Sequence, residues 1–264
     1  MPGDSRGPTG PVVLLAGPGD TTDIVANYLT RHVDDLRLVV EAPPSRLAMA
    51  RRRATRIGWF TVLGQVLFVA LALPILRWQG RHRISEILEQ SGLDATPYPR
   101  ATHVPSVNDP QTATLLGSLH PEVVVVNGTR IISRSLLDAL DCPIVNTHAG
   151  ITPRFRGVHG GYWALVQGTP EFVGTTVHLV DPGIDTGGVL AQATFEPTGA
   201  DTVATYPYLH LAAGLPLLAD QLAHFREVGH LTALPTSASP EASRLFLHPT
   251  LWQYVRHRVE DGVR

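Results

Sequence analysis

Short apolar runs alternate with helix-like stretches through the first half of the chain. Residues 12–16 and 36–40 are two such runs, and residues 123–126 are four consecutive valines. A run that is apolar at every position is typical of a parallel strand with both faces buried. Together with a further short run at 143–146, the pattern predicts an α/β fold with a mostly parallel sheet and helices on both faces.

The pattern changes after residue 170. Two strand-like runs, 173–180 and 189–195, lie on either side of the turn-rich sequence DPGIDTGG. A loop of this kind, without a crossover helix, predicts an antiparallel strand pair near residues 173–195. We expect a long helix at about 202–228 to follow.

The domain plan follows from these elements. We expect a disordered leader at 1–10, which is polar and rich in Gly and Pro, and a catalytic domain at 11–230. A helical insert at about 51–90 interrupts that domain. Residues 231–264 are expected to form a C-terminal extension.

The insert is unusual because its apolar centre has basic flanks. The twenty residues from Ile57 to Leu76 carry no formal charge, and residues 51–83 hold arginines before and after them. This length could cross a bilayer, but one crossing would separate the first two strands from the rest of their sheet. Three interpretations stay open: a buried or homodimer-forming helix, a helix lying in a membrane interface with arginines at anionic headgroups, and a true span.

Composition sets limits on the function. With 44% apolar and 17% charged residues among 264, the chain can bury a real core. A net charge of −2 excludes a general nucleic-acid partner from our expectations. Cys142 is the single cysteine and cannot form an internal disulfide, so we expect a cytoplasmic protein, either free or peripheral at the membrane.

The densest polar cluster lies at the end of a predicted strand. Asn146 and His148 are two residues apart, so in an extended chain they point to the same face. The amide can donate to an oxyanion, and the imidazole can move protons near neutral pH. An ordinary polar strand end would look the same, so this pair alone leaves both readings open.

Two later stretches add candidate groups. The sequence ITPRFRGVHGG is a glycine-punctuated loop that carries His159, and HLVDPGIDTGG carries His178, Asp181 and Asp185. Aspartate is common in turns for structural reasons, so each carboxylate alone is weak evidence of function. The spacing of these histidines and aspartates does not match the local zinc patterns, and no metal site is predicted.

Taken together, these stretches resemble the formyltransferase family, which includes glycinamide ribonucleotide, methionyl-tRNA and sugar N-formyltransferases. The family pattern is Asn-x-His, then a Pro-x-aromatic-x-Gly loop, then a His-x-Val loop that ends in Asp-x-Gly. The matching residues are Asn146, His148, Pro153, Phe155, Gly157, His178, Val180, Ile184, Asp185 and Gly187. A weaker likeness continues through PEVVVVNGTRIIS, so the resemblance covers about residues 11–230.

The resemblance implies a Rossmann-like fold and transfer of a formyl group from 10-formyltetrahydrofolate to a primary amine of a small molecule. It makes His148 the proton carrier, Asn146 the oxyanion donor and Asp185 the group that orients His148. It leaves two roles open for His178: either it only supports the fold, or it lies behind the catalytic residues and positions them. The implied folate contacts are Thr129, Arg130, Ile131, Ile132, Val180, Asp181 and Gly183. The implied contacts to the acceptor are Gly17, Asp20 and His159.

The first turn departs from the family pattern. Its sequence is Gly-Pro-Gly-Asp, with a proline that lacks an amide donor and a carboxylate where the glycinamide ribonucleotide branch binds phosphate. We therefore expect neither that substrate nor, without a further C-terminal domain, tRNA. An amino sugar or a specialised-metabolite amine is expected instead. The alternatives are hydrolysis of formyl folate and a non-catalytic, membrane-associated scaffold.

Overall fold

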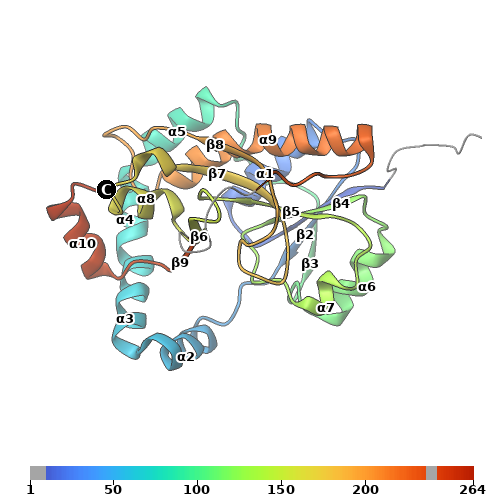
Figure 1. Cartoon of the computed structure of the whole chain (residues 1–264). Helices are drawn as coiled ribbons and strands as arrows, with labels where there is room; N and C mark the ends of the chain where they lie inside the picture. Colours follow the sequence, from blue (N-terminus) through green and yellow to red (C-terminus); the bar gives the residue numbers. More distant parts are fainter. Residues whose placement is uncertain (1–9, 236–242) are drawn as a thin grey trace, which may run out of the picture.

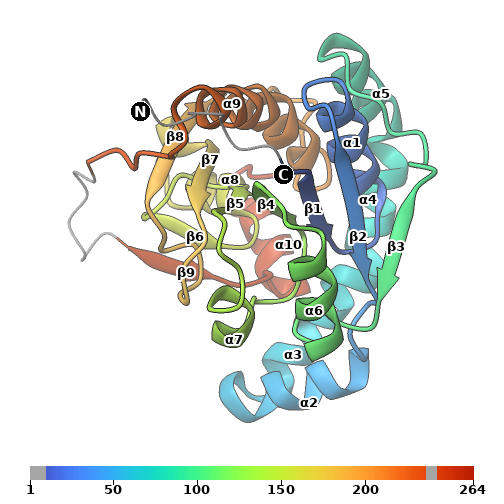
Figure 2. The same ribbon diagram turned by 90° about the vertical axis from the view of Figure 1, so that its right-hand side faces the viewer.

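A seven-stranded sheet forms the centre of the computed structural model, which describes residues 10–235 and 243–264. The strand order is β3-β2-β1-β4-β5-β7-β8 (Figures 1 and 2). The first five strands are parallel: β1 (Val12–Ala16), β2 (Leu36–Glu41), β3 (Ala101–Val104), β4 (Val123–Asn127) and β5 (Ile144–His148). The last two, β7 (Gly174–Leu179) and β8 (Val189–Thr194), are antiparallel. The predicted fold and strand pair are therefore confirmed.

Helices cover both faces of this sheet. On one face, α1 (Asp20–Thr30), α5 (Arg81–Gln90) and α9 (Tyr206–Val228) pack on Leu14 and Val125. On the other face, α6 (Pro110–Ser118) and α7 (Arg134–Leu137) pack on Leu15 and Val124. Successive side chains of β1 and β4 thus enter opposite cores, which explains why both strands are apolar throughout.

Several elements escaped the sequence reading. They are β3, a two-stranded sheet of β6 (Phe155–Gly157) and β9 (Arg244–Phe246), the short η2 turn (Pro170–Phe172) and α10 (Leu251–Glu260). A further helix, α8 (Gly160–Val166), follows the glycine-punctuated loop that carries His159. The described part of the C-terminal extension packs against the body, because Phe246 stacks on Trp163 and the Tyr162 hydroxyl bonds His257. The predicted leader lies almost wholly outside the described residues.

The insert is a chain of helices between β2 and β3. It consists of α2 (Arg46–Ile57), α3 (Trp59–Leu67), the π-helical turn η1 (Phe68–Ala72), α4 (Leu73–Gln79) and α5. Residues Trp59–Gln79 together form one continuous helix, which is long enough and apolar enough to cross a membrane. However, β2 and β3 are neighbours in the sheet, so both ends of the insert return to the same body. The spanning interpretation is therefore wrong.

The buried-helix interpretation of the insert is also wrong. Only 28% of the most apolar window of Trp59–Gln79 is buried inside the protein. Its large side chains face outward, with Phe60 72% and Trp78 66% exposed. The helix therefore packs on the body through one side, where Phe68 and Leu76 are buried, and leaves its other side exposed.

Candidate functional site

Asn146 and His148 lie at the carboxyl end of β5, where ligands collect in open α/β sheets. The neighbouring β7 runs antiparallel to β5 and places His178 directly opposite Asn146. Asp185 comes from the loop that joins β7 to β8. Residues that are far apart in the sequence thus meet because two strands pair and one loop folds back over them.

The Asp185 carboxylate is the centre of this group. Its Oδ2 lies 3.5 Å from His148 Nδ1, and its Oδ1 lies 3.6 Å from His178 Nε2 and 3.5 Å from Asn146 Nδ2. The backbone amide of Gly157 donates to Oδ2 at 2.8 Å. Asp185 has a φ of +50°, an uncommon backbone conformation for a residue other than glycine. The loop therefore holds the carboxylate in a specific position, facing two imidazoles.

The proton positions on His148 follow from its partners. The Phe155 carbonyl can only accept, so His148 donates to it from Nε2 at 2.7 Å. The other ring nitrogen, Nδ1, faces Asp185. Burial lowers the pKa of His148 below its ordinary value, and the nearby Asp185 only partly opposes this shift. At neutral pH the imidazole is neutral, and Nδ1 is free to take up a proton.

Asp185 itself stays ionised. Burial raises its pKa, but the neighbouring His178 and His148 side chains and the Gly157 amide together outweigh burial and lower it overall. A proton arriving between Asp185 and His148 would be attracted by the carboxylate and accepted by the imidazole. The pair can therefore hold a proton during a reaction at this edge of the sheet.

His178 fixes the Asn146 amide. The Leu179 carbonyl accepts from His178 Nδ1 at 2.7 Å, which leaves Nε2 to accept from Asn146 Nδ2 at 3.1 Å. The remaining contact of that amide nitrogen, to Asp185, is long at 3.5 Å. One N–H of the Asn146 amide thus donates to His178, and the other is only weakly held, by the long contact to Asp185. The role of His178 depends on the pairing of β5 with β7, which the sequence alone does not show, so the sequence left this role open.

The loop after β5 supplies two further groups that the sequence reading did not assign. Phe155 is buried and offers its carbonyl to His148, while Gly157 offers its amide to Asp185. Gly157 has a φ of +95°, and a Cβ there would collide with the Phe246 carbonyl. Arg156 donates to the Ile184 carbonyl at 3.1 Å. The matched motif residues in this loop therefore position the cluster through the backbone.

The predicted folate contacts lie in two loops on either side of the end of β5. Thr129, Ile131 and Ile132 belong to the loop after β4, and Ile131 is 62% exposed while Ile132 is buried. Arg130 in this loop pairs with the buried Glu41, which also accepts the Arg130 amide at 2.7 Å. This pairing fixes the loop to β2.

The second predicted folate loop follows β7. Val180 continues the sheet by donating to the Ile144 carbonyl at 2.7 Å. Asp181 closes the turn by accepting from the Gly183 amide at 3.0 Å and the Thr186 hydroxyl at 2.6 Å. The turn ends at Asp185, so this loop links the predicted folate contacts to the cluster.

The predicted acceptor contacts lie elsewhere. Gly17 lies close against Gly128. The Asp20 carboxylate accepts from the Tyr208 hydroxyl and pairs with Arg77 at 2.6 Å. His159 bonds to His248 at 2.9 Å, and burial lowers its pKa to about 3. Within the described chain, none of the three has a hydrogen bond to the cluster around Asp185.

Sequence comparison relates the chain to known formyltransferases. The formyl transferase family model matches residues 77–209, which contain Asn146, His148 and Asp185. A methionyl-tRNA formyltransferase from Anaeromyxobacter dehalogenans is 30% identical over 223 residues, covering 76% of this chain and 70% of the relative. In two other curated methionyl-tRNA formyltransferases the match covers about half of their length, 49% and 52%.

Solved structures share the fold. Glycinamide ribonucleotide transformylase 1 from Symbiobacterium toebii superposes with a TM-score of 0.57 at 19% identity, covering 87% of this chain and 92% of that one. An N-formyltransferase from Helicobacter canadensis, in complex with folinic acid and dTDP-3-aminofucose, gives a TM-score of 0.51 at 15% identity, covering 89% and 70%. At these identities the likeness concerns the fold alone.

Proposed function

Since the chain belongs to the formyl transferase family, and is by that membership a transferase enzyme, we propose that it moves a formyl group from 10-formyltetrahydrofolate to a primary amine. The observation that supports this most directly is the meeting of an amide, an imidazole and a carboxylate at Asn146, His148 and Asp185. Formyl transfer to an amine needs these three kinds of group.

Each group has a role in the reaction. The amine nitrogen attacks the formyl carbon, a new C–N bond forms, and the formyl oxygen becomes an oxyanion to which the weakly held N–H of Asn146 donates. The bond between the formyl carbon and N10 of the folate then breaks, and its electron pair stays on N10. The proton lost by the amine passes to the His148–Asp185 pair and from there to N10. Atoms and charge balance without a metal or a second cofactor.

The folate would lie across the two loops on either side of β5. Family members use formyl-tetrahydrofolate, and one structural neighbour was solved with folinic acid, a related formyl folate. The amides of Arg130, Val180 and Gly183 are already bonded within the protein. The remaining backbone amides and carbonyls at 129–132 and in the turn from Val180 to Gly183 suit a pterin edge. The exposed Ile131 offers apolar surface to the ring.

For the acceptor we propose an amino sugar or another small amine of specialised metabolism. The carboxylate of Asp20 occupies the first turn, and Arg77 and Tyr208 already hold it. This arrangement disfavours a phosphate at that turn. A relative is named for methionyl-tRNA and a structural neighbour holds dTDP-3-aminofucose, so both acceptor classes belong in a test. We place the reaction in the cytoplasm, free or at the membrane surface.

The test is a panel of amines incubated with the protein and 10-formyltetrahydrofolate, read by a mass gain of one formyl group. The panel holds free amino sugars, nucleotide-linked amino sugars, lipid-linked amines and methionyl-tRNA. A gain on a small amine that is lost in His148→Ala supports the proposal. Release of formate at the same rate with and without amines would identify a hydrolase and overturn it.

A further inference from the structure

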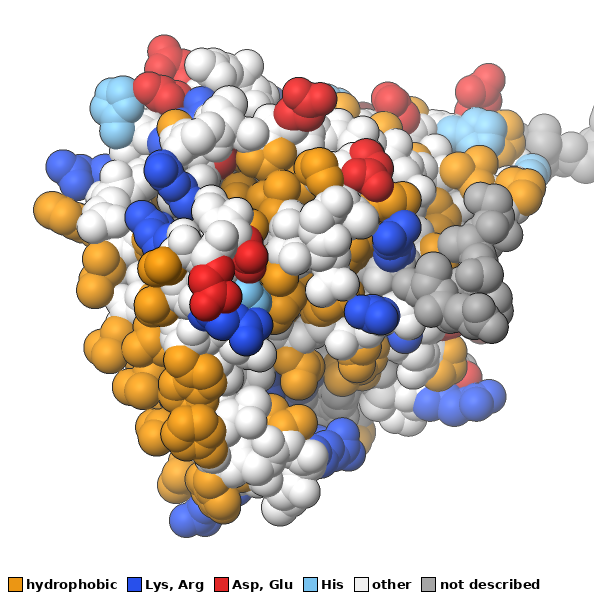
Figure 3. Space-filling model, turned by 60° about the vertical axis from the view of Figure 1, so that its left-hand side comes forward, with side chains coloured by type: hydrophobic (Ala, Val, Ile, Leu, Met, Phe, Trp, Pro, Cys, Tyr) orange, Lys and Arg blue, Asp and Glu red, His pale blue; other side chains and the backbone are white. Residues whose placement is uncertain are grey.

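The outward side of the Trp59–Gln79 helix is apolar over most of its length, with Arg77 and Gln79 exposed near its end. Figure 3 shows hydrophobic side chains gathered on the side of the molecule that carries α3, α4 and α10 in Figure 1. Their exposed members on the helix, here called the apolar face, are Trp59, Phe60, Leu63, Val66, Val69, Leu71, Ile75 and Trp78. A surface helix of a soluble protein normally turns polar residues outward. This helix does the reverse.

The helix is fixed in this orientation by its inner side. Phe68 is fully buried, and Gln65 donates to the His248 carbonyl at 2.9 Å. Gly64 allows close approach to α10, because a Cβ there would collide with the Trp252 ring. The helix cannot rotate its apolar face inward without breaking these contacts, so the face stays exposed until something covers it.

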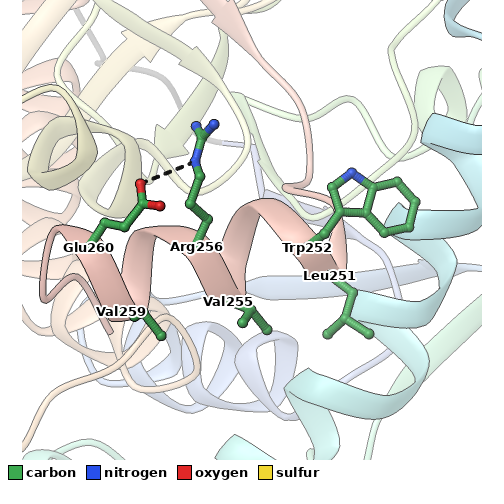
Figure 4. A pocket seen from close by; sticks show the side chains of 6 residues that line it. All are labelled: Leu251, Trp252, Val255, Arg256, Val259 and Glu260. Carbon is green, nitrogen blue, oxygen red and sulfur yellow. Dashed lines mark ion pairs between the residues drawn. The ribbon is translucent and has the colours of Figure 1, made fainter.

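The apolar surface continues onto α10. Phe60 stacks on Trp252 with ring centroids 4.3 Å apart. Along α10, Val255 is 50% and Val259 77% exposed, and both line a hollow together with Leu251 and Trp252 (Figure 4). Arg256 and Glu260 line the same hollow and pair with each other at 3.9 Å. Two separate elements thus present one apolar surface larger than a single helix side.

Charge decides what this surface fits. Between Glu41 and Glu86 the sequence has no acidic residue. It has eight arginines there: Arg46, Arg51, Arg52, Arg53, Arg56, Arg77, Arg81 and Arg83. Arg51, Arg52 and Arg56 on α2 are exposed, and no ion pair involves them in the part of the chain that the structure describes. An anionic headgroup layer would neutralise such a basic flank.

A second copy of the chain fits this surface less well. A symmetric dimer brings the same patch of both subunits together. The arginines beside the apolar face would then meet arginines, with no acidic residue in the stretch between Glu41 and Glu86 to pair with them. The aromatic side chains favour the same conclusion, because Trp59, Trp78 and Trp252 are of the type that concentrates at membrane interfaces.

We propose that the apolar face and the exposed side of α10 dock this protein onto an anionic lipid bilayer. The helix lies in the plane of the membrane, with its apolar side chains at the acyl boundary and the α2 arginines at the headgroups. Nothing crosses the membrane, because the sheet on both sides of the insert is one body.

Docking would place the acceptor side of the site near the membrane. Phe68 packs edge-on against His159 at 6.0 Å, and Arg77 bonds to Asp20, so the insert contacts two of the predicted acceptor residues. A membrane-held amine, such as a lipid-linked amino sugar, is the acceptor class that this arrangement fits. This last step rests on the proposed function, whereas the docking does not.

The test is flotation of the full chain with vesicles of phosphatidylcholine, alone or mixed with phosphatidylglycerol, without folate or amine. We expect binding to the mixed vesicles and little to the neutral ones. The double variant Leu63→Glu with Ile75→Glu should lose at least about tenfold in binding, and Arg51→Ser with Arg52→Ser about thirtyfold. Val228→Glu, at an exposed apolar residue of α9, is the matched control and should bind normally.

A second readout follows from the tryptophans. Three of the four, Trp59, Trp78 and Trp252, lie on this surface, so brominated lipids should quench most of the fluorescence on binding. Failure to float with anionic vesicles, or equal flotation of the Leu63→Glu and Ile75→Glu double variant, would overturn the proposal. The proposal would also be overturned if the unchanged protein forms a stable dimer, if the double variant dissociates that dimer, and if neither protein binds vesicles. Because no reactant is present, these outcomes leave the proposed function untouched.

Discussion

Replacing Asp185 by asparagine removes one negative charge from the centre of the cluster while keeping the shape of the side chain. The asparagine oxygen can still accept from the Gly157 amide, which the carboxylate does at 2.8 Å. The change therefore tests the charge rather than the fold of the loop. His148 would lose the group that stabilises it when it takes up a proton.

The magnitude follows from the distance. A protonated His148 and the Asp185 carboxylate, 3.5 Å apart, attract each other by about 4.7 kcal/mol at an effective dielectric constant of about 20. The amide dipole of the asparagine recovers part of this. We expect the barrier to rise by about 3 to 4 kcal/mol, which lowers kcat by about 10² to 10³. KM for the folate should change by less than about threefold, since the interaction forms mainly in the transition state.

The assay is steady-state formylation of the acceptor found in the amine panel, with unfolding temperature as the folding control. Asp138→Asn is the matched control, because Asp138 is an exposed carboxylate just after α7 that pairs with Arg134 and lies outside the cluster and the folate loops. It should keep kcat within a few-fold of the unchanged enzyme. A kcat for Asp185→Asn within about fivefold of the unchanged enzyme, or an equal loss in Asp138→Asn, would refute the reasoning.

Three further predictions concern histidines and the anchoring of the insert. His178→Ala should lower kcat about tenfold or more by freeing the catalytic amide, with KM little changed and partial recovery in His178→Gln; an unchanged kcat would contradict this. Burial lowers the pKa of His210 to about 3. Below pH 6.5 the unfolded chain therefore binds a proton at this histidine while the folded chain does not, so the free energy of unfolding decreases as the pH decreases. His210→Leu should reduce the loss of unfolding free energy between pH 7 and 5 by about 2 kcal/mol in denaturant titrations, and an identical pH slope would be contrary evidence. Arg83→Leu leaves the buried Asp201 unpaired and should cost about 3 to 5 kcal/mol of unfolding free energy, against less than about 1 kcal/mol for the exposed Arg134→Leu.

Apart from β8, the strands that the sequence predicted are largely buried on both faces. In β4, residues 123–126 are all buried, so the apolar pattern is complete. By contrast, β3 is an edge strand whose Thr102 and His103 are exposed, and its pattern carries no strand signal. The strand β9 pairs with β6 across some ninety positions of sequence, from Phe155 to Arg244, and no local pattern reports such a contact.

The cluster was predictable to the extent that its residues share a local motif. The spacing of Asn146 and His148 indicates a common face, but their link to His178 depends on the antiparallel pairing of β5 with β7. The state of Asp20 could not be foreseen either, since its partner Arg77 comes from the insert. Sequence therefore identified the chemical groups, while their hydrogen bonds required the folded chain.

The most direct test of the central claim follows an isotopically labelled formyl carbon from 10-formyltetrahydrofolate in a single turnover with the acceptor amine. We predict that the label appears on the amine nitrogen with the intact protein and that Asn146→Ala and His148→Ala each slow this step by at least about 10². Transfer at an undiminished rate in both variants would contradict the account, because the reaction would then take place without the groups at the end of β5.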